Sequence, residues 1–111
     1  MQPGLPILVV DDDPDALSYL DLALRERGFT TRTAADGIAA LLAMESELPA
    51  LIVSDLQMPS MGGIELLRHT KQRWPEIPFI MLTVAHEVGT VVEAMRIGAS
   101  NYILKPASPA A

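Results

Sequence analysis

Short, purely apolar runs alternate along this chain with longer stretches in which apolar residues return every three or four positions. The run 7–10 (Ile-Leu-Val-Val) contains no polar side chain, as expected for a strand that is buried on both faces. Leu17, Leu20 and Leu24 instead have the spacing of one face of a helix. The alternation predicts an α/β domain whose parallel sheet is covered by helices on both faces. The expected strands are 7–10, 29–34, 50–54, 79–83 and 101–104, and the expected helices are 14–27, 38–46, 64–74 and 87–97.

Aspartate, proline and glycine mark the ends of these elements. Asp13 precedes Pro14, a pair typical of a helix start, because the carboxylate accepts from free amides and proline suits the first turn. Gly28 stands where that helix should end. Asp36-Gly37 predicts a turn before the second helix. Asp13 is therefore interpreted as a helix cap and not as part of a site.

Length and composition narrow the class of protein. The chain has 111 residues and no cysteine, so we expect one domain without disulfides or thiolate metal sites. The formal net charge is -6 and the basic residues are scattered, which argues against direct nucleic-acid binding. No apolar run approaches the roughly 18 residues of a membrane span, and the first residues do not resemble a signal peptide. We therefore expect a cytoplasmic protein.

Polar side chains gather at the predicted carboxyl ends of the strands. Asp11 and Asp12 follow the first strand, Asp55 follows the third, Thr83 ends the fourth, and Lys105 follows the fifth. Parallel strands bring these ends to one edge of the sheet, where such folds bind ligands. Clustered carboxylates repel one another unless a cation relieves them, and a small set of oxygen ligands suits Mg²⁺. A central carboxylate can also attack a phosphoryl group, whose charge Mg²⁺, the Lys105 ammonium and the Thr83 hydroxyl would neutralise.

Several motifs in order resemble one family. They are the acidic pair after the first strand, Asp55 followed by Met58-Pro59 and Gly63, Thr83 after the fourth strand, and Lys105-Pro106 after the fifth. From Leu5 to Pro106 the chain resembles the receiver domain of two-component response regulators. The resemblance implies a flavodoxin-like, doubly wound sheet of five parallel strands in the order 2-1-3-4-5, with the receiver domain over 5–106. Residues 107–111 are interpreted as a linker or as the cut end of a longer chain.

The resemblance also implies a role for each acidic residue. Asp55 would be the phosphoacceptor. Asp12 and Asp55 would bind Mg²⁺ directly, together with the backbone carbonyl of Gln57, and Asp11 would hold a metal-bound water. The phosphoryl donor would be a histidine kinase or a histidine phosphotransfer protein, and the phosphorylated domain would control an effector domain or a partner.

Other residues would contact or report the phosphoryl group. By the same resemblance, Thr83 would bond to it and Lys105 would pair with one of its oxygens. Tyr102 matches an aromatic residue that changes between outward and inward packing when Thr83 moves. The bond between Lys105 and Pro106 would be cis, which the tertiary amide of proline permits. The surface near Thr83 and Tyr102 would then be the switch.

The chain departs from the family pattern in some places. Val84 stands where a small residue is usual, so phosphorylation by small donors is expected to be slow. Gln57 and Ala85 occupy positions that tune hydrolysis of the aspartyl phosphate, and Ala85 cannot bond to an attacking water. We therefore expect a phosphorylated state of moderate to long lifetime. Five residues follow Pro106, too few for the family's fifth helix, so we expect truncation or cover of the apolar face by a second copy.

Other classes of function stay open on the sequence. A small Mg²⁺-dependent phosphohydrolase of the haloacid dehalogenase kind would have an acid two residues after Asp55, where this chain has Gln57. A flavodoxin-like nucleotide or flavin carrier would need hydroxyl and glycine residues, not three acids, after the first strand. A receiver-like scaffold that is never phosphorylated would not need the complete set of strand-end polar residues. The phosphorylated receiver domain is the hypothesis that we favour.

Overall fold

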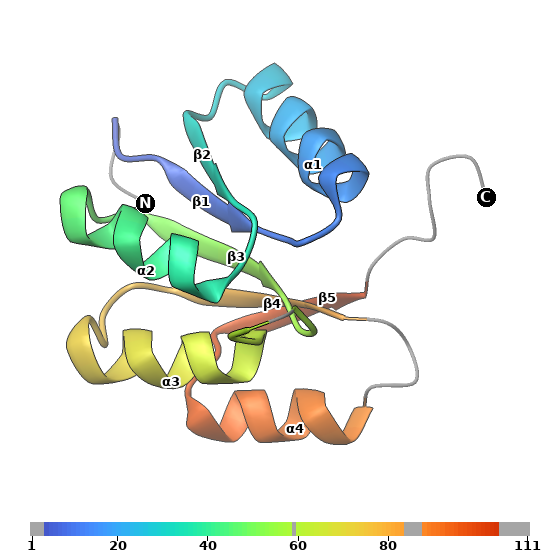
Figure 1. The fold of residues 1–111 in the computed structure, drawn as a ribbon, viewed down its shortest axis with the longest axis vertical. Coiled ribbons are helices and arrows are strands. Elements are labelled where there is room, and N and C mark those ends of the chain that lie inside the picture. The colour runs from blue at the N-terminus through green and yellow to red at the C-terminus, as the bar shows by residue number, and fades with distance from the viewer. Residues whose placement is uncertain (1–3, 59, 84–87, 105–111) are drawn as a thin grey trace.

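A five-stranded parallel sheet lies at the centre of the computed structural model, which describes residues 4–58, 60–83 and 88–104 (Figure 1). Its order is β2-β1-β3-β4-β5, which confirms the predicted topology. The connection from β2 to β3 passes β1, so β1 lies between β2 and β3 and pairs with both. The strands are β1 (Ile7–Val10), β2 (Thr31–Ala34), β3 (Leu51–Asp55), β4 (Phe79–Thr83) and β5 (Asn101–Leu104).

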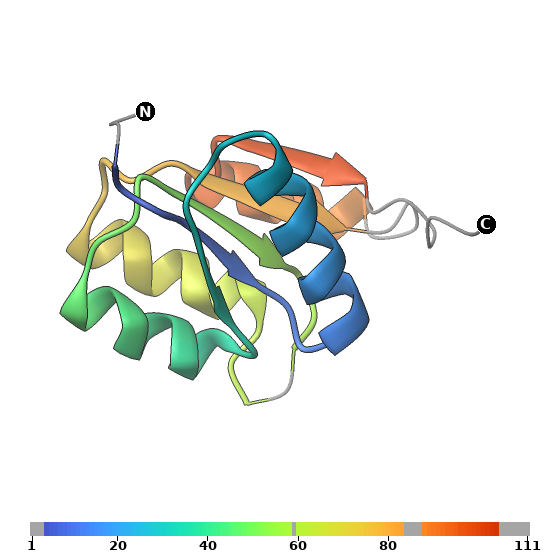
Figure 2. The same ribbon diagram turned by 90° about the horizontal axis from the view of Figure 1, so that it is seen from above.

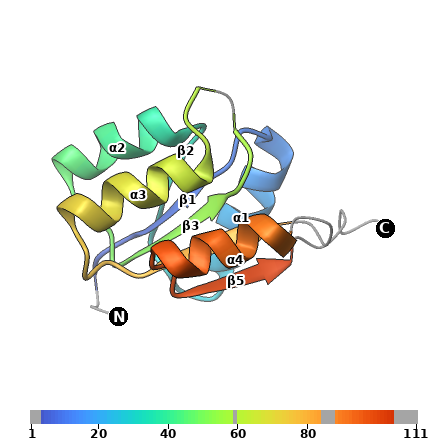
Figure 3. The ribbon, with the colours of Figure 1, turned by 90° about the horizontal axis from the view of Figure 1, so that it is seen from below.

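The described helices lie on both faces of the sheet but are unequally divided. Helix α1 (Pro14–Glu26) covers one face, while α2 (Gly37–Ser46), α3 (Gly63–Arg73) and α4 (Val88–Ile97) lie side by side on the other (Figures 1 and 3). All residues of α1 are described, and none of them is fully buried. Both faces are therefore covered as predicted, but less completely on the α1 side. Within the described ranges, no helix is long and apolar enough to cross a bilayer.

The predicted helix ends are largely confirmed, and the differences have local causes. The Asp13 side chain accepts from the amide of Asp15 at 3.1 Å and so caps α1. Gly28 has φ of +92°, the left-handed conformation expected after a helix. Strand β2 begins later than predicted, because the Phe29 amide bonds to the carbonyl oxygen of Leu24 and still belongs to the end of α1.

The predicted turn at Asp36-Gly37 is the first turn of α2. The Asp36 side chain accepts from the Ala39 amide at 2.8 Å, which makes Asp36 the cap, and Gly37 is the first helical residue. The third strand begins and ends one residue later than predicted and so includes Asp55. The second difference places Asp55 in regular structure, where the backbone is held by hydrogen bonds.

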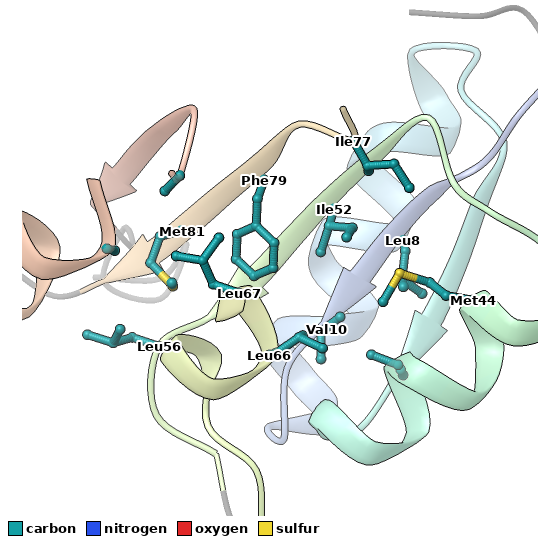
Figure 4. Close-up of a cluster of buried hydrophobic side chains, with 14 residues drawn as sticks. Leu8, Val10, Met44, Ile52, Leu56, Leu66, Leu67, Ile77, Phe79 and Met81 are labelled. Atoms are coloured by element: carbon teal, nitrogen blue, oxygen red, sulfur yellow. The ribbon is translucent and has the colours of Figure 1, made fainter. Parts of the chain in front are cut away.

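The main core fills the space between the sheet and helices α2, α3 and α4 (Figure 4). Phe79 and Met81 of β4 and Leu66 and Leu67 of α3 are all fully buried. Each such side chain contributes about 1.5–3 kcal/mol relative to an exposed position. The core therefore holds β3 and β4 firmly against α3, and these are the elements that carry Asp55 and Thr83.

A polar network ties α1 to the start of β2. The hydroxyl of Thr31, which is 4% exposed, donates to Oδ1 of Asp21. Nε of Arg25 donates to the same carboxylate oxygen at 3.1 Å, and its Nη2 donates to the Thr31 carbonyl at 3.3 Å. The Thr31 hydroxyl and, less strongly, Arg25 lower the pKa of Asp21 below 3.8, although partial burial opposes the shift. The ionised carboxylate is thus the form that the fold stabilises.

Replacing Thr31 by valine keeps the branched shape but removes the hydroxyl. We expect Thr31→Val to lower the free energy of unfolding at neutral pH by about 1 kcal/mol. Because the folded-state pKa of Asp21 lies below 3.8, the stabilisation is present above that pH and is lost as the pH falls through the lower folded value. Urea titrations across this range should therefore show the difference shrinking in acid. Thr33→Val, at an exposed position of the same strand, is the matched control. If Thr31→Val lost the same free energy of unfolding above and below pH 3.8, a preferential bond of the Thr31 hydroxyl to ionised Asp21 would be contradicted.

Ser60 occupies a conformation that glycine would adopt more readily. Its φ is +67°, in the left-handed region that costs about 1 kcal/mol for a residue with a side chain. We expect Ser60→Gly to raise the melting temperature. Gly28→Ser should lower it because φ at Gly28 is +92°. No described atom lies within 4 Å of a Cβ at Gly28, so the backbone conformation alone would cause this loss. Ser18→Gly, within α1, should be destabilising. Calorimetry on the three variants tests the assignment, and a destabilised Ser60→Gly would refute it.

Candidate functional site

The carboxyl ends of the strands meet at one edge of the sheet, where α1 begins and the loop after β3 extends (Figure 2). Asp11 directly follows β1, and Asp55 is the last residue of β3. Because Val10 and Ser54 are partners in the parallel ladder, Asp11 and Asp55 lie at the same level of neighbouring strands. The juxtaposition predicted from the sequence is therefore a direct consequence of the strand register.

Three carboxylates form a cluster at this edge. One oxygen from each of Asp11, Asp12 and Asp55 lies within 4.8 Å of the others. Asp11 is completely buried and Asp55 is 8% exposed, whereas Asp12 faces solvent. Hard divalent cations prefer carboxylate and carbonyl oxygens, and Mg²⁺ commonly uses one or two carboxylates with water in the remaining positions. The donor set and its spacing therefore fit Mg²⁺.

Backbone amides orient two of these carboxylates. The Asp13 amide donates to Oδ1 of Asp11 at 3.0 Å, and the Leu56 amide donates to Oδ1 of Asp55 at 2.9 Å. Hydrogen bonds from backbone amides restrict the rotamer of a carboxylate. Asp13 thus contributes an amide to the cluster and a side chain to the helix cap. Its carboxylate is not part of the cluster, as predicted.

The hydroxyl of Ser54 is a feature that the sequence prediction missed. It is fully buried and donates to the Asp55 carbonyl oxygen at 2.9 Å. This hydrogen bond helps to hold the backbone of Asp55 in place. The available signal was a single hydroxyl residue at the end of an otherwise apolar run, which by itself is also consistent with ordinary strand packing.

The loop between β3 and α3 is pinned at its base. The Gly63 amide donates to the Leu56 carbonyl at 2.8 Å. A Cβ on Gly63 would collide with the Asp55 carbonyl oxygen and would lie 3.0 Å from Cα of Leu56, so this position requires glycine. Gln57, whose backbone carbonyl was expected to face the metal, is exposed and follows directly after Leu56. The close approach of α3 to β3 therefore defines where this loop leaves the sheet.

Thr83 and Tyr102 lie on the neighbouring strands β4 and β5. Thr83 is 2% exposed, and it stands one residue beyond Leu82, the ladder partner of Asp55. Tyr102 is 44% exposed, and its ladder partner is Met81, two residues before Thr83. The structure thus places Thr83 beside the acidic cluster and Tyr102 on an outer strand with its side chain half in solvent.

Some predicted positions lie outside the described residues. These are the phosphoryl-pairing Lys105 and the cis bond to Pro106, together with the tuning positions Val84 and Ala85. The predictions made for them stay predictions.

Comparison with known proteins identifies the family. The family model of the response regulator receiver domain matches residues 7–111. The DNA-binding transcriptional regulator NtrC of Escherichia coli (strain K12) is 39% identical over 106 residues, covering 96% of this chain and 22% of NtrC. The DNA-binding response regulator MtrA of Mycolicibacterium smegmatis is 39% identical over 103 residues, covering 93% of this chain and 45% of MtrA. This chain therefore spans less than half the length of these relatives.

Solved structures agree with this assignment. The receiver domain of NtrX from Brucella abortus has a TM-score of 0.87 at 36% identity, over 92% of this chain and 87% of that one. The chemotaxis protein CheY4 of Vibrio cholerae has a TM-score of 0.87 at 29% identity, over 96% of this chain and 90% of that one. Because the family model, the relatives and the solved structures all point to one family, this chain belongs to the response regulator receiver domains of two-component phosphorelay signalling.

Proposed function

We propose that Asp55 is the phosphoacceptor of this receiver domain and that Mg²⁺ assists the transfer. The observation that supports this assignment is the cluster of Asp11, Asp12 and Asp55, whose oxygens lie within 4.8 Å of one another at the ends of β1 and β3. Asp12 and Asp55 would bind the metal directly, together with the backbone carbonyl of Gln57. Asp11, which is buried, would hold a metal-bound water.

In the proposed reaction, a carboxylate oxygen of Asp55 attacks the phosphorus atom of a phosphohistidine on a kinase or a phosphotransfer protein. The phosphorus–nitrogen bond breaks, its electron pair stays with the imidazole, and an acyl phosphate forms on Asp55. Bound Mg²⁺ would supply positive charge to the phosphoryl oxygens during the transfer. The amide of Leu56 fixes Oδ1 of Asp55 at 2.9 Å, so the nucleophile is already oriented.

The same residues carry the proposed output. Thr83 ends β4 beside Asp55, and its hydroxyl would bond to the phosphoryl group, assisted by Lys105. Movement of Thr83 would allow Tyr102, half-exposed in the present structure, to pack inward. Such a change of packing alters a surface without unfolding it, and longer relatives would couple that surface to an effector domain.

The receiver domain is a signalling module and not a dedicated enzyme. We propose that its only catalysis is its own phosphorylation and dephosphorylation. Gln57 is exposed at the position where a phosphohydrolase would carry a second acid, and an amide cannot donate or remove a proton at neutral pH. With Ala85 at the second tuning position, we expect a phosphorylated state of moderate to long lifetime. A cytoplasmic location and a homodimer stay predictions.

The first test is phosphorylation with Mg²⁺ by a histidine kinase and, over a longer incubation, by acetyl phosphate, a small donor for which slow transfer is expected. We expect the wild-type protein to accept one phosphoryl group and Asp55→Asn to accept none, because the amide is not a nucleophile. Asp13→Asn is the matched control and should be phosphorylated like the wild type. Intact-protein mass spectrometry measures the result. Equal phosphorylation of Asp55→Asn and the wild type would refute the phosphoacceptor, and continuous release of phosphate without a modified protein would favour the phosphohydrolase.

The second test separates the metal-binding acid from its neighbour. Repulsion within the cluster should make Asp12→Asn more heat-stable than the wild type without metal. Mg²⁺ at 100 times its Kd should then stabilise the wild type by about 2.7 kcal/mol and Asp12→Asn much less. Asp13→Asn should retain the full Mg²⁺ effect, because asparagine caps a helix as well as aspartate does. Thermal melts with and without Mg²⁺ measure both effects. If Asp12→Asn and Asp13→Asn lost the same share of the Mg²⁺ stabilisation, the assignment of Asp12 as a metal ligand would be contradicted.

A further inference from the structure

Helix α2 touches the loop that is expected to carry the metal-binding carbonyl of Gln57. Figure 3 shows the start of α2 beside the loop between β3 and α3, and Figure 2 shows the same proximity from another side. The contact is made by Gly37, the first residue of α2, and Met61 in the loop. Gly37 is buried, and Met61 is half-buried against the main core.

The contact leaves no room for a side chain on Gly37. A Cβ placed there would lie 2.7 Å from Cγ of Met61, 2.9 Å from its Cβ and 2.9 Å from its backbone oxygen. Real Cβ atoms essentially never approach other heavy atoms to under 3.0 Å. A flexible side chain could turn away, but the backbone oxygen could not. A substitution at Gly37 would therefore move the backbone of the loop at Met61.

The loop is short and fixed on its other side. The Gly63 amide bonds to the Leu56 carbonyl at 2.8 Å, and α3 begins at Gly63. Ser60, next to Met61, has φ of +67°, so the loop already contains a backbone conformation that is costly for serine. Because the base of the loop is held at Leu56 and Gly63, we expect a displacement at Met61 to change the position of Gln57.

We infer that Gly37 is a positioning residue for the metal site, acting through Met61 on the loop that bears the Gln57 carbonyl. This inference rests on the proposed function, because it assumes that Gln57 contributes a metal ligand. Asp36 fixes the start of α2 by accepting from the Ala39 amide at 2.8 Å, so α2 itself offers a rigid surface. The contact between Gly37 and Met61 then determines how far the loop, and with it the Gln57 carbonyl, lies from the acidic cluster.

The test compares two glycines at the starts of helices. Gly37 is the first residue of α2, and Gly89 is the second residue of α4, where a Cβ would meet no described atom within 4 Å. We expect Gly37→Ala to weaken Mg²⁺ binding about tenfold, the lower end of effects seen for groups that orient metal ligands. Gly89→Ala should leave the Mg²⁺ Kd unchanged and raise the melting temperature, because alanine favours a helix. Isothermal titration of the folded proteins measures the Kd.

Two further measurements separate positioning from loss of stability. In Gly37→Ala, phosphorylation by acetyl phosphate should need about tenfold more Mg²⁺ for its half-maximal rate, and the rate at saturating Mg²⁺ should approach that of the wild type. Met61→Gly removes the side chain that rests on Gly37 and should also weaken Mg²⁺ binding. The double variant should bind about as weakly as either single variant, because both changes disturb one contact.

The outcomes distinguish this inference from the proposed function. A wild-type protein that neither binds Mg²⁺ nor accepts a phosphoryl group would contradict the proposed function. A wild type that does both, with an unchanged Mg²⁺ Kd in Gly37→Ala, would overturn only the role of Gly37. If Gly37→Ala does not fold, Met61→Gly carries the test, and an unchanged Mg²⁺ Kd in that variant overturns the inference.

Discussion

The register between β1 and β3 is the constraint on which the rest of the structure depends. Pairing of Val10 with Ser54 brings the residues after them, Asp11 and Asp55, to the same level at one edge of the sheet. With Asp12, their oxygens lie within 4.8 Å of one another. At such distances each pair of ionised carboxylates repels by a few kcal/mol at an effective dielectric constant of about 20. A cation bound at this edge would attract all three carboxylates and relieve their mutual repulsion.

The apolar core allows the domain to keep this unfavourable cluster. Phe79, Met81, Leu66 and Leu67 are fully buried between the sheet and α3, directly behind the strands that carry the reactive residues. Backbone amides and the Ser54 hydroxyl then fix the acids and the adjoining backbone in one arrangement. Apolar packing behind the strands thus supplies stability, while the strand ends are left for chemistry.

Much of this arrangement could be predicted from the sequence, because it follows from periodicity and strand order. Strands β1, β4 and β5 have the predicted bounds, and the alternation of strands and helices was sufficient to bring Asp11 and Asp55 together. Phe29 was wrongly assigned to a strand, since its amide completes the end of α1 through a contact that apolar patterning does not reveal. The contact of Gly37 with Met61 joins a helix start to a loop distant in sequence, and no local pattern encodes it.

The proposed metal site can be tested directly in crystals grown with Mn²⁺ in place of Mg²⁺, because Mn²⁺ scatters anomalously and takes similar oxygen ligands. The predicted result is one anomalous peak bound by carboxylate oxygens of Asp12 and Asp55 and by the carbonyl oxygen of Gln57, with Asp11 within hydrogen-bond reach of a metal-bound water. A peak elsewhere, or no peak while the three carboxylates keep their present spacing, would contradict the claim that this edge of the sheet is built to hold a divalent cation.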